Sequence, residues 1–379
     1  MVREISREVN YLMESVSLLR HLGAGDSYSE LKELLSRKYA ASFREGLRKF
    51  EVLERIEREA ERVFAEDMEQ LRYYFPKQDD SVMGCPGCLA LLWEDYRCAD
   101  FPDTATFGDY LRGLSEREYC EQFGAGLQSY TESFARGANA AVKMSVPYEV
   151  ICYLMTMEIG DAEKWKLQKI FFDRAAHIDT LVGFLQRAEA LLRTFRGELE
   201  ELMALFYQYW SKIVEEQDFV SCIREATNVN MESSPLGFRL QASLLHPNGM
   251  TLHNDMGEDE LTYEKPDYYL IGILFGEDFH FSVNLGQREA DYEVYAVSVL
   301  KLLADKSKFA ILSYIRDREA YGSELAKHLN LTTATVSHHM NALFTAGLVR
   351  VSHIDNRVYY TANREALAEV LDYCKGILT

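Results

Sequence analysis

Residues Gly322 to Val349 read GSELAKHLNLTTATVSHHMNALFTAGLV, and this stretch decides the fold of the C-terminal part of the chain. It contains a short helical pattern, a polar turn, a second helical pattern with a polar face, and a glycine that ends it. That order predicts a helix-turn-helix. The next stretch, LVRVSHIDNRVYYTA (residues 348–362), has Asp355-Asn356 at its centre and predicts a two-stranded ribbon. The two together predict a winged helix.

The side chains of the second helix divide into an apolar and a polar set. Val336, Met340, Leu343 and Phe344 recur at three- and four-residue intervals and predict the buried stripe. Ser323 is expected to cap the first helix, and Thr332 or Thr333 the second, because a side-chain oxygen accepts bonds from the free N–H groups of a first turn. Gly347 is expected to end the second helix.

The polar set predicts a DNA-contacting surface, because short polar side chains bond phosphates and base edges without bulk. Arginines on the ribbon are expected to reach the phosphate backbone. The predicted DNA-contacting residues are Ser323, Thr332, Thr333, Thr335, Ser337, His338, Asn341, Arg350 and Arg357. His339 is expected to be structural, packed beneath the helix.

Four features of residues 295–377 together resemble the ArsR (arsenic-repressor) family of bacterial transcriptional regulators. They are LLADKSKFAILSYI (302–315), Ser337-His338-His339-Met340, AGLV (346–349) and Tyr359-Tyr360. The resemblance implies a homodimer that binds double-stranded DNA at an operator and leaves when a signal arrives. In that family the helix before the motif and the helix after the wing usually build the dimer, which implies residues 295–316 and 364–376 here.

The sequence departs from the family pattern at two places. His338 stands where the family often has Arg, so this phosphate contact is expected to be weaker or to depend on pH. Tyr321-Gly322-Ser323 stands where metal sensors carry a Cys-x-Cys pair, and the last helix has no His and only Cys374. Because thiolate and imidazole ligands cannot be replaced by these residues, we expect neither metal sensing at the family's sites nor a cofactor.

Composition limits the class of protein. The chain has 379 residues, 47% hydrophobic, and a net charge of −19, whereas residues 291–379 hold ten Lys and Arg and ten Asp and Glu. The net charge of residues 291–379 is therefore zero, and the whole net charge of −19 lies before residue 291. Non-specific DNA affinity is expected to be modest. Seven irregularly spaced cysteines and the lack of a signal or membrane-length apolar run indicate a cytoplasmic protein. No nucleophile elbow or phosphate loop appears, so an enzyme is not expected.

The fold predicted for the whole chain is mainly α, with a large N-terminal helical domain, a small α/β segment and a C-terminal winged helix. Residues 1–216 are expected to form a helical bundle, including one long helix over Phe43–Phe75 and a continuous run from His177 to about Gln217. Residues 217–290 are expected to form a small α/β region, with a hairpin turn at Asn248-Gly249. Residues 291–379 complete the chain as the winged helix.

Several other interpretations stay open. Cys85 and Cys88 have the spacing of half a zinc site or of a redox pair, although a Pro-Gly turn entering a helix explains them as well. His246, His253 and His280 lie on three candidate strands and are weaker metal candidates. Aromatic runs at Met203–Trp210 and Tyr148–Met157 fit core packing better than a pocket for a small-molecule or protein effector. Finally, a winged helix with a neutral charge also suits a protein-interaction module.

Overall fold

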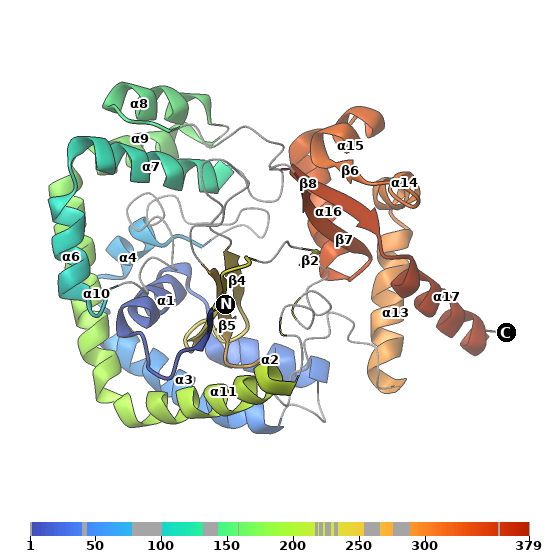
Figure 1. Cartoon of the computed structure of the whole chain (residues 1–379), viewed down its shortest axis with the longest axis horizontal. Coiled ribbons are helices and arrows are strands. Elements are labelled where there is room, and N and C mark those ends of the chain that lie inside the picture. Colours follow the sequence, from blue (N-terminus) through green and yellow to red (C-terminus); the bar gives the residue numbers. More distant parts are fainter. Residues whose placement is uncertain are drawn as a thin grey trace. The chain divides into compact units, whose positions relative to one another are not determined.

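The computed structural model describes residues 2–39, 44–77, 101–131, 143–157, 159–216, 219, 223, 229–230, 234–253, 266–275, 289–354 and 357–378. The chain is mainly α-helical, as the sequence predicts, and the described residues also form two small sheets (Figure 1). It divides into an N-terminal unit (1–133, 141–211, 234–278) and a C-terminal unit (134–140, 212–233, 279–379). The division into domains at residues 216 and 290 stays a prediction.

The N-terminal unit is built mainly of helices. They are α1 (Tyr11–Ala24), α2 (Tyr28–Tyr39), α3 (Arg44–Val63), α4 (Met68–Tyr74), α6 (Thr104–Gly113), α7 (Glu116–Thr131), α8 (Pro147–Thr156), α9 (Asp161–Phe172), α10 (Arg174–Thr194) and α11 (Arg196–Glu216). Both long helices expected from the sequence are broken, the first after α3 and the second between α10 and α11. Each break holds a buried phenylalanine, Phe64 and Phe195. Burying each ring in the core favours a bend over a straight helix.

The sheet of the N-terminal unit begins with a strand that the sequence did not predict. Its order is β1 (Val2–Ile5), β3 (Gly237–Ser243), β5 (Asp267–Gly272) and β4 (Met250–His253). The first three strands are parallel and β4 is antiparallel to β5. Ile5 therefore pairs with Leu240 of β3 instead of joining the helical bundle expected over residues 1–216. The helix starts at Tyr11 because the Asn10 side chain accepts a bond from the Met13 N–H at 2.9 Å.

The hairpin predicted at Asn248-Gly249 is wrong, although a turn does form there. Strands β3 and β4 lie on opposite sides of β5, so they do not pair with each other. The turn instead crosses one end of β5, where the Gly272 N–H donates to the Gly249 carbonyl at 2.8 Å. A Cβ on Gly272 would lie 2.2 Å from the Pro247 carbonyl oxygen, so a glycine is needed at this crossing.

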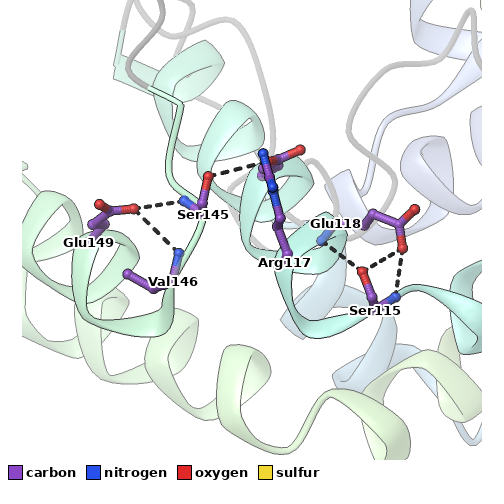
Figure 2. Close-up of polar contacts among 7 residues, drawn as sticks. Ser115, Arg117, Glu118, Ser145, Val146 and Glu149 are labelled. Atoms are coloured by element: carbon purple, nitrogen blue, oxygen red, sulfur yellow. Dashed lines mark hydrogen bonds and ion pairs between the residues drawn. The ribbon is translucent and has the colours of Figure 1, made fainter.

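Side-chain caps begin two helices of the N-terminal unit, and the cap of α7 is reciprocal (Figure 2). The Glu118 carboxylate accepts from the Ser115 N–H at 2.8 Å, and the Ser115 hydroxyl accepts from the Glu118 N–H at 3.3 Å, which makes a capping box for α7. At α8 the Glu149 carboxylate accepts from the Ser145 N–H at 2.7 Å. The Ser145 hydroxyl also donates to Glu121 of α7 at 3.2 Å, which joins the starts of the two helices.

The C-terminal unit contains the winged helix. Its elements are β2 (Val229–Asn230), α13 (Glu289–Leu303), α14 (Lys306–Tyr314), β6 (Ala320–Tyr321), α15 (Gly322–Leu329), α16 (Thr333–Thr345), β7 (Val349–Ile354), β8 (Arg357–Ala362) and α17 (Arg364–Leu378). The sheet has the order β2-β7-β8-β6, in which β7 and β8 are the predicted ribbon. Strand β2 runs parallel to β7 and comes from a part of the chain where no strand of the wing was expected.

One apolar core holds these elements together. Val336, Met340 and Leu343 of α16 lie in it with Leu325 of α15 and Tyr360 of β8. Helix α13 contacts both α14 and α17. Three residues of the predicted stripe are therefore buried, and the fourth, Phe344, is partly buried against the same core. The stripe fixes which side of α16 faces outward.

Candidate nucleic-acid interface

The first helix of the motif begins earlier than expected. The N-cap of α15 is Tyr321, whose side chain makes no capping bond, and Ser323 is the second residue of the helix. The predicted Ser323 cap is therefore wrong. Tyr321 pairs with Tyr359 across the sheet, and this pairing holds the chain extended up to the start of the helix. Ser323 is exposed and stays a predicted DNA contact.

The turn between the helices fixes the direction of α16. Asn330 adopts the left-handed conformation at φ 52°, which short polar side chains tolerate better than others. The Leu331 N–H then donates to the Ala326 carbonyl at 2.9 Å. Thr332 is the N-cap of α16, as predicted, and its hydroxyl accepts from the Thr335 N–H at 3.0 Å. Helix α16 thus leaves the turn with its first free N–H groups partly satisfied.

The surface of α16 opposite its buried stripe is polar. Val336, Met340 and Leu343 are at most 1% exposed. Away from them, Thr333 and His338 are exposed, and the other predicted contacts on this helix are half-buried: Thr335, Ser337 and Asn341. The packing of the domain therefore leaves the predicted contact residues of α16 outside the core. No Lys or Arg lies within α16.

The two neighbouring histidines of α16 have different surroundings. His338 is exposed, whereas His339 is half-buried. Burial, and then the nearby Lys308 ammonium, lower the pKa of His339. Its Nδ1 atom is buried and has no hydrogen-bond partner among the described residues. The buried Nδ1 atom and the lowered pKa of His339 support the structural role expected for it.

The wing carries the two predicted arginines at different places. Arg350 of β7 is exposed and lies opposite Thr361 of β8. Arg357 begins β8 opposite Ile354, and its side chain lies outside the described residues. The Asp355-Asn356 tip of the ribbon also lies outside the described residues. Together, β7 and β8 place both arginine positions on one ribbon beside the helix-turn-helix.

Tyr314 of α14 joins α14 to α15, a role that the sequence analysis missed. Its hydroxyl donates to the Glu324 carboxylate at 2.9 Å, and its ring lies 4.1 Å from the His328 ring. The Arg318 guanidinium lies 4.2 Å from the same ring. The hydrogen bond to Glu324, followed by burial, raises the pKa of Tyr314. The signal in the sequence was an aromatic residue at the end of the helix before the motif.

The candidate thiol and metal sites are not brought together by what the structure describes. Cys85, Cys88 and the His280 side chain lie outside the described residues, as does the side chain of His253. Among the described residues, no group of three or more His, Cys, Asp or Glu side chains could hold a metal ion. No described helix has the length and apolar character needed to cross a bilayer.

The known proteins and the family profile that are similar to this chain match it in the C-terminal unit. The sequence profile of the bacterial regulatory proteins of the arsR family matches residues 299–351. The arsenical resistance operon repressor of Staphylococcus aureus is 30% identical over 74 residues, which are 20% of this chain and 71% of the repressor. The regulator CmtR of Mycobacterium tuberculosis is 35% identical over 71 residues, 19% of this chain and 60% of CmtR. The solved structure of reduced HlyU from Vibrio cholerae is 29% identical and covers 21% of this chain and 86% of HlyU, with a TM-score of 0.20.

Proposed function

Because the chain belongs to the arsR family of bacterial regulatory proteins through its C-terminal part, we propose that it regulates transcription by binding double-stranded DNA. One observation carries the proposal: α16 buries Val336, Met340 and Leu343 almost completely, packs Phe344 partly against the same core, and leaves short polar side chains outside it. A helix with such a surface can approach the floor of the major groove, where base edges are read by hydrogen bonds. The matched relatives are a repressor and a regulator, which supports the same class. A regulator that binds bacterial DNA would act in the cytoplasm, so the proposal places the protein there.

The division of labour follows from the positions of the residues. Thr333, Ser337 and Asn341 are separated by four residues each, so they recur on about the same side of α16 and are assigned to base edges. Arg350 and Arg357 on the wing are assigned to phosphates, which position the protein without selecting a sequence. His338 stands where the family often has an arginine, so its phosphate contact is expected to be weaker.

A homodimer through the C-terminal unit is part of the proposal. Five large apolar residues of this unit are between 40% and 59% exposed: Val297, Leu300, Phe309, Leu371 and Ile377. All lie on α13, α14 and α17, within or next to the helices that the family uses for dimers. Apolar side chains grouped on neighbouring elements favour association over exposure to water. Two copies related by a two-fold axis would offer two recognition helices to a palindromic operator.

The role of the N-terminal unit in this proposal is control. It binds an effector, or it sets the spacing of the two winged helices, and an effector acts by favouring one spacing. Differential binding to two spacings is enough to change operator affinity, because a ligand shifts an equilibrium by the ratio of its affinities for the two states.

The test is a mobility-shift titration of the full chain on DNA from its own promoter region, beside an unrelated DNA of equal length. Retention of the promoter DNA at lower protein concentration supports the proposal. Equal retention of both DNAs, or none even at low salt, overturns it. The second outcome favours a protein-interaction module, which the lack of Lys and Arg in α16 would suit.

Variants of the full chain then separate the two kinds of contact. Ser337→Ala or Asn341→Ala should reduce the difference between the affinity for promoter DNA and the affinity for unrelated DNA. Arg357→Ala should weaken both DNAs alike and lower the slope of log affinity against log salt by about one ion. Ser313→Ala, at an exposed position of α14, is the matched control and should change neither quantity. A uniform loss from both kinds of variant would refute these residue assignments.

A further inference from the structure

A hollow of about 570 Å³ lies on the N-terminal unit between α4 and α9. Tyr73 of α4 lines it together with Trp165, Lys166, Lys169 and Phe172 of α9. This volume falls in the usual range of small-molecule sites. These residues carried no predicted role, although KWKLQKIFF (164–172) alternates cations with aromatic and aliphatic side chains.

The walls of the hollow are aromatic and exposed. Trp165 is 73% exposed and Phe172 is 66% exposed, which is unusual for rings of this size in a unit with a large buried core. Tyr73 also lines the hollow, and its ring is stacked on that of His177 with ring centroids 6.1 Å apart and 11° between the planes. A flat ring entering the hollow would therefore meet aromatic faces and would cover apolar surface that water now contacts.

The hollow is cationic although the chain is acidic. Two lysines line it and no carboxylate does, in a chain with a net charge of −19. Lys166 is partly neutralised by Glu163 at 3.3 Å and lies 4.9 Å from the Tyr73 ring. Lys169 has no ion pair among the described residues, and after burial its charge is the next cause that lowers the pKa of His177. An anion beside Lys169 would meet an unneutralised ammonium.

Tyr73, which lines the hollow, also has a polar group without a partner among the described residues. The Tyr73 hydroxyl is buried and has no hydrogen-bond partner among the described residues. Leaving a buried donor unpaired costs free energy, which a ligand oxygen at the same place would recover. Phenol hydroxyl and ammonium groups both donate to carboxylates, so the two donors favour the same kind of ligand.

The wall formed by α9 is held in place by α8. The Lys164 ammonium donates to the Met155 carbonyl at 3.1 Å, and the Gln168 amide lies 3.5 Å from the Met155 sulfur. The start of α8 is in turn capped by Glu149 and joined to α7, as Figure 2 shows. A wall that is fixed before binding reduces the entropy cost of binding.

We propose that this hollow binds a small planar aromatic carboxylate, with its ring against Trp165 and Phe172 and its charge at Lys169. The Tyr73 hydroxyl is assigned as a second donor to the carboxylate. This names a ligand class for the effector of the proposed regulator and rests on that proposal for its role, whereas binding itself is measured without DNA.

The test is calorimetric titration of the full chain with 1-naphthoate and two comparison probes. Cyclohexanecarboxylate keeps the charge without an aromatic ring, and 1-naphthalenemethanol keeps the rings without the charge. 1-Naphthoate should bind at one site, at least about tenfold tighter than either comparison probe, which corresponds to about 1.4 kcal/mol. No heat of binding from 1-naphthoate up to about 1 mM, near −4 kcal/mol of binding free energy, overturns the proposal. Equal affinity for all three probes overturns it too.

Variants locate the site. Lys169→Gln and Phe172→Ala are changes at exposed positions, so the fold should survive, and each should weaken 1-naphthoate binding at least about fivefold, or roughly 1 kcal/mol. The matched controls are Lys212→Gln and Leu205→Ala on α11, which remove the same charge and a similar apolar side chain elsewhere. Unchanged binding by both α9 variants places the probe elsewhere and rejects this site. Failure of DNA binding in a separate assay would leave this result standing.

Discussion

The buried side chain of Glu14 supplies hydrogen-bond acceptors for two backbone N–H groups where the chain leaves the sheet. After β3 the chain leaves its sheet, and the N–H groups of Leu244 and Leu245 lose strand partners. The two carboxylate oxygens of Glu14 accept these bonds, both at 2.8 Å, although the residue is only 1% exposed. Burial raises the pKa of Glu14 to about 7, against the lowering effect of the two backbone bonds.

This raised pKa predicts a stability that falls as pH rises. The unfolded carboxyl loses its proton near pH 4.3, whereas the folded one keeps it to about 7, so the folded state binds more protons between these values. The free energy of unfolding should therefore decrease by about 3 kcal/mol from pH 4.5 to 7.5 on account of this group. Glu14→Gln should remove that decrease, as measured by urea unfolding across this pH range. The exposed Glu69→Gln is the control, and parallel curves for the two variants would contradict the assignment.

At the residue scale, the capping residues show what the sequence could predict. Thr332 caps α16 as expected, because its hydroxyl and the N–H it accepts from are three residues apart and fixed by local geometry. Ser323 has the same chemistry and fails, because a contact with β8, about forty residues away along the chain, sets where α15 begins. The candidate contact side chains on α16 were predictable because they too depend on local geometry: helical periodicity alone separates them from the buried stripe.

At the scale of elements, the end of α16 depends on a single backbone conformation. Gly347 lies at φ 70°, and the Leu348 N–H donates back to the Leu343 carbonyl at 3.0 Å. This is the Schellman pattern, which closes a helix by a left-handed residue. The Asn363 side chain also donates to the Gly347 carbonyl at 2.9 Å, so the start of α17 holds the same turn.

Gly347→Ala should therefore destabilise the C-terminal unit by about 1–2 kcal/mol, the cost of a Cβ in the left-handed region. The measurement is urea or thermal unfolding of the variant beside the parent protein. Gly376→Ala in α17 is the control, because a Cβ there meets nothing within 4 Å and alanine favours a helix. That control should be neutral or slightly stabilising. Equal losses from both variants would remove the special role of Gly347.

Among the elements, long-range strand pairing was the part that the sequence could not predict. The ribbon β7–β8 follows from alternation and a short connection, whereas β1 pairs with β3 across more than two hundred residues. Nothing local distinguishes Ile5 as a strand residue, because an isolated apolar position fits a helix equally well. The turn at Asn248-Gly249 was predicted, but the strand that separates β3 from β4 comes later in the chain.

At the scale of the whole molecule, net charge and apolar exposure support different functions for different parts. The residues before 291 carry the whole net charge of −19, whereas residues 291–379 have a net charge of zero. Specific contacts therefore contribute more to the proposed DNA affinity than general attraction to phosphates does. The exposed apolar side chains of α13, α14 and α17 favour a different interaction, the association of two chains into a dimer.

The dimer proposal predicts that a charge in this apolar set separates the chains. Leu371 of α17 is 52% exposed, and Leu371→Asp should weaken the dimer at least about tenfold, because it leaves a carboxylate in an apolar interface. Sedimentation velocity at micromolar concentration measures the change. Leu34→Asp, at a position of α2 that is 61% exposed, is the matched control and should remain dimeric. A monomeric parent protein would rule the dimer out.

Strand β2 has a practical consequence for anyone who wishes to isolate the winged helix. Val229 and Asn230 supply the neighbour of Val351 and Ser352 on β7, yet they lie some seventy residues before the span matched by the family profile. A fragment that starts at residue 291 would lack β2, so the N–H and C=O groups on that edge of β7 would be unpaired. Such an exposed edge strand can pair with a strand of another molecule. The fragment that starts at residue 291 should therefore self-associate, whereas a fragment that starts at residue 212 retains β2 as the neighbour of β7.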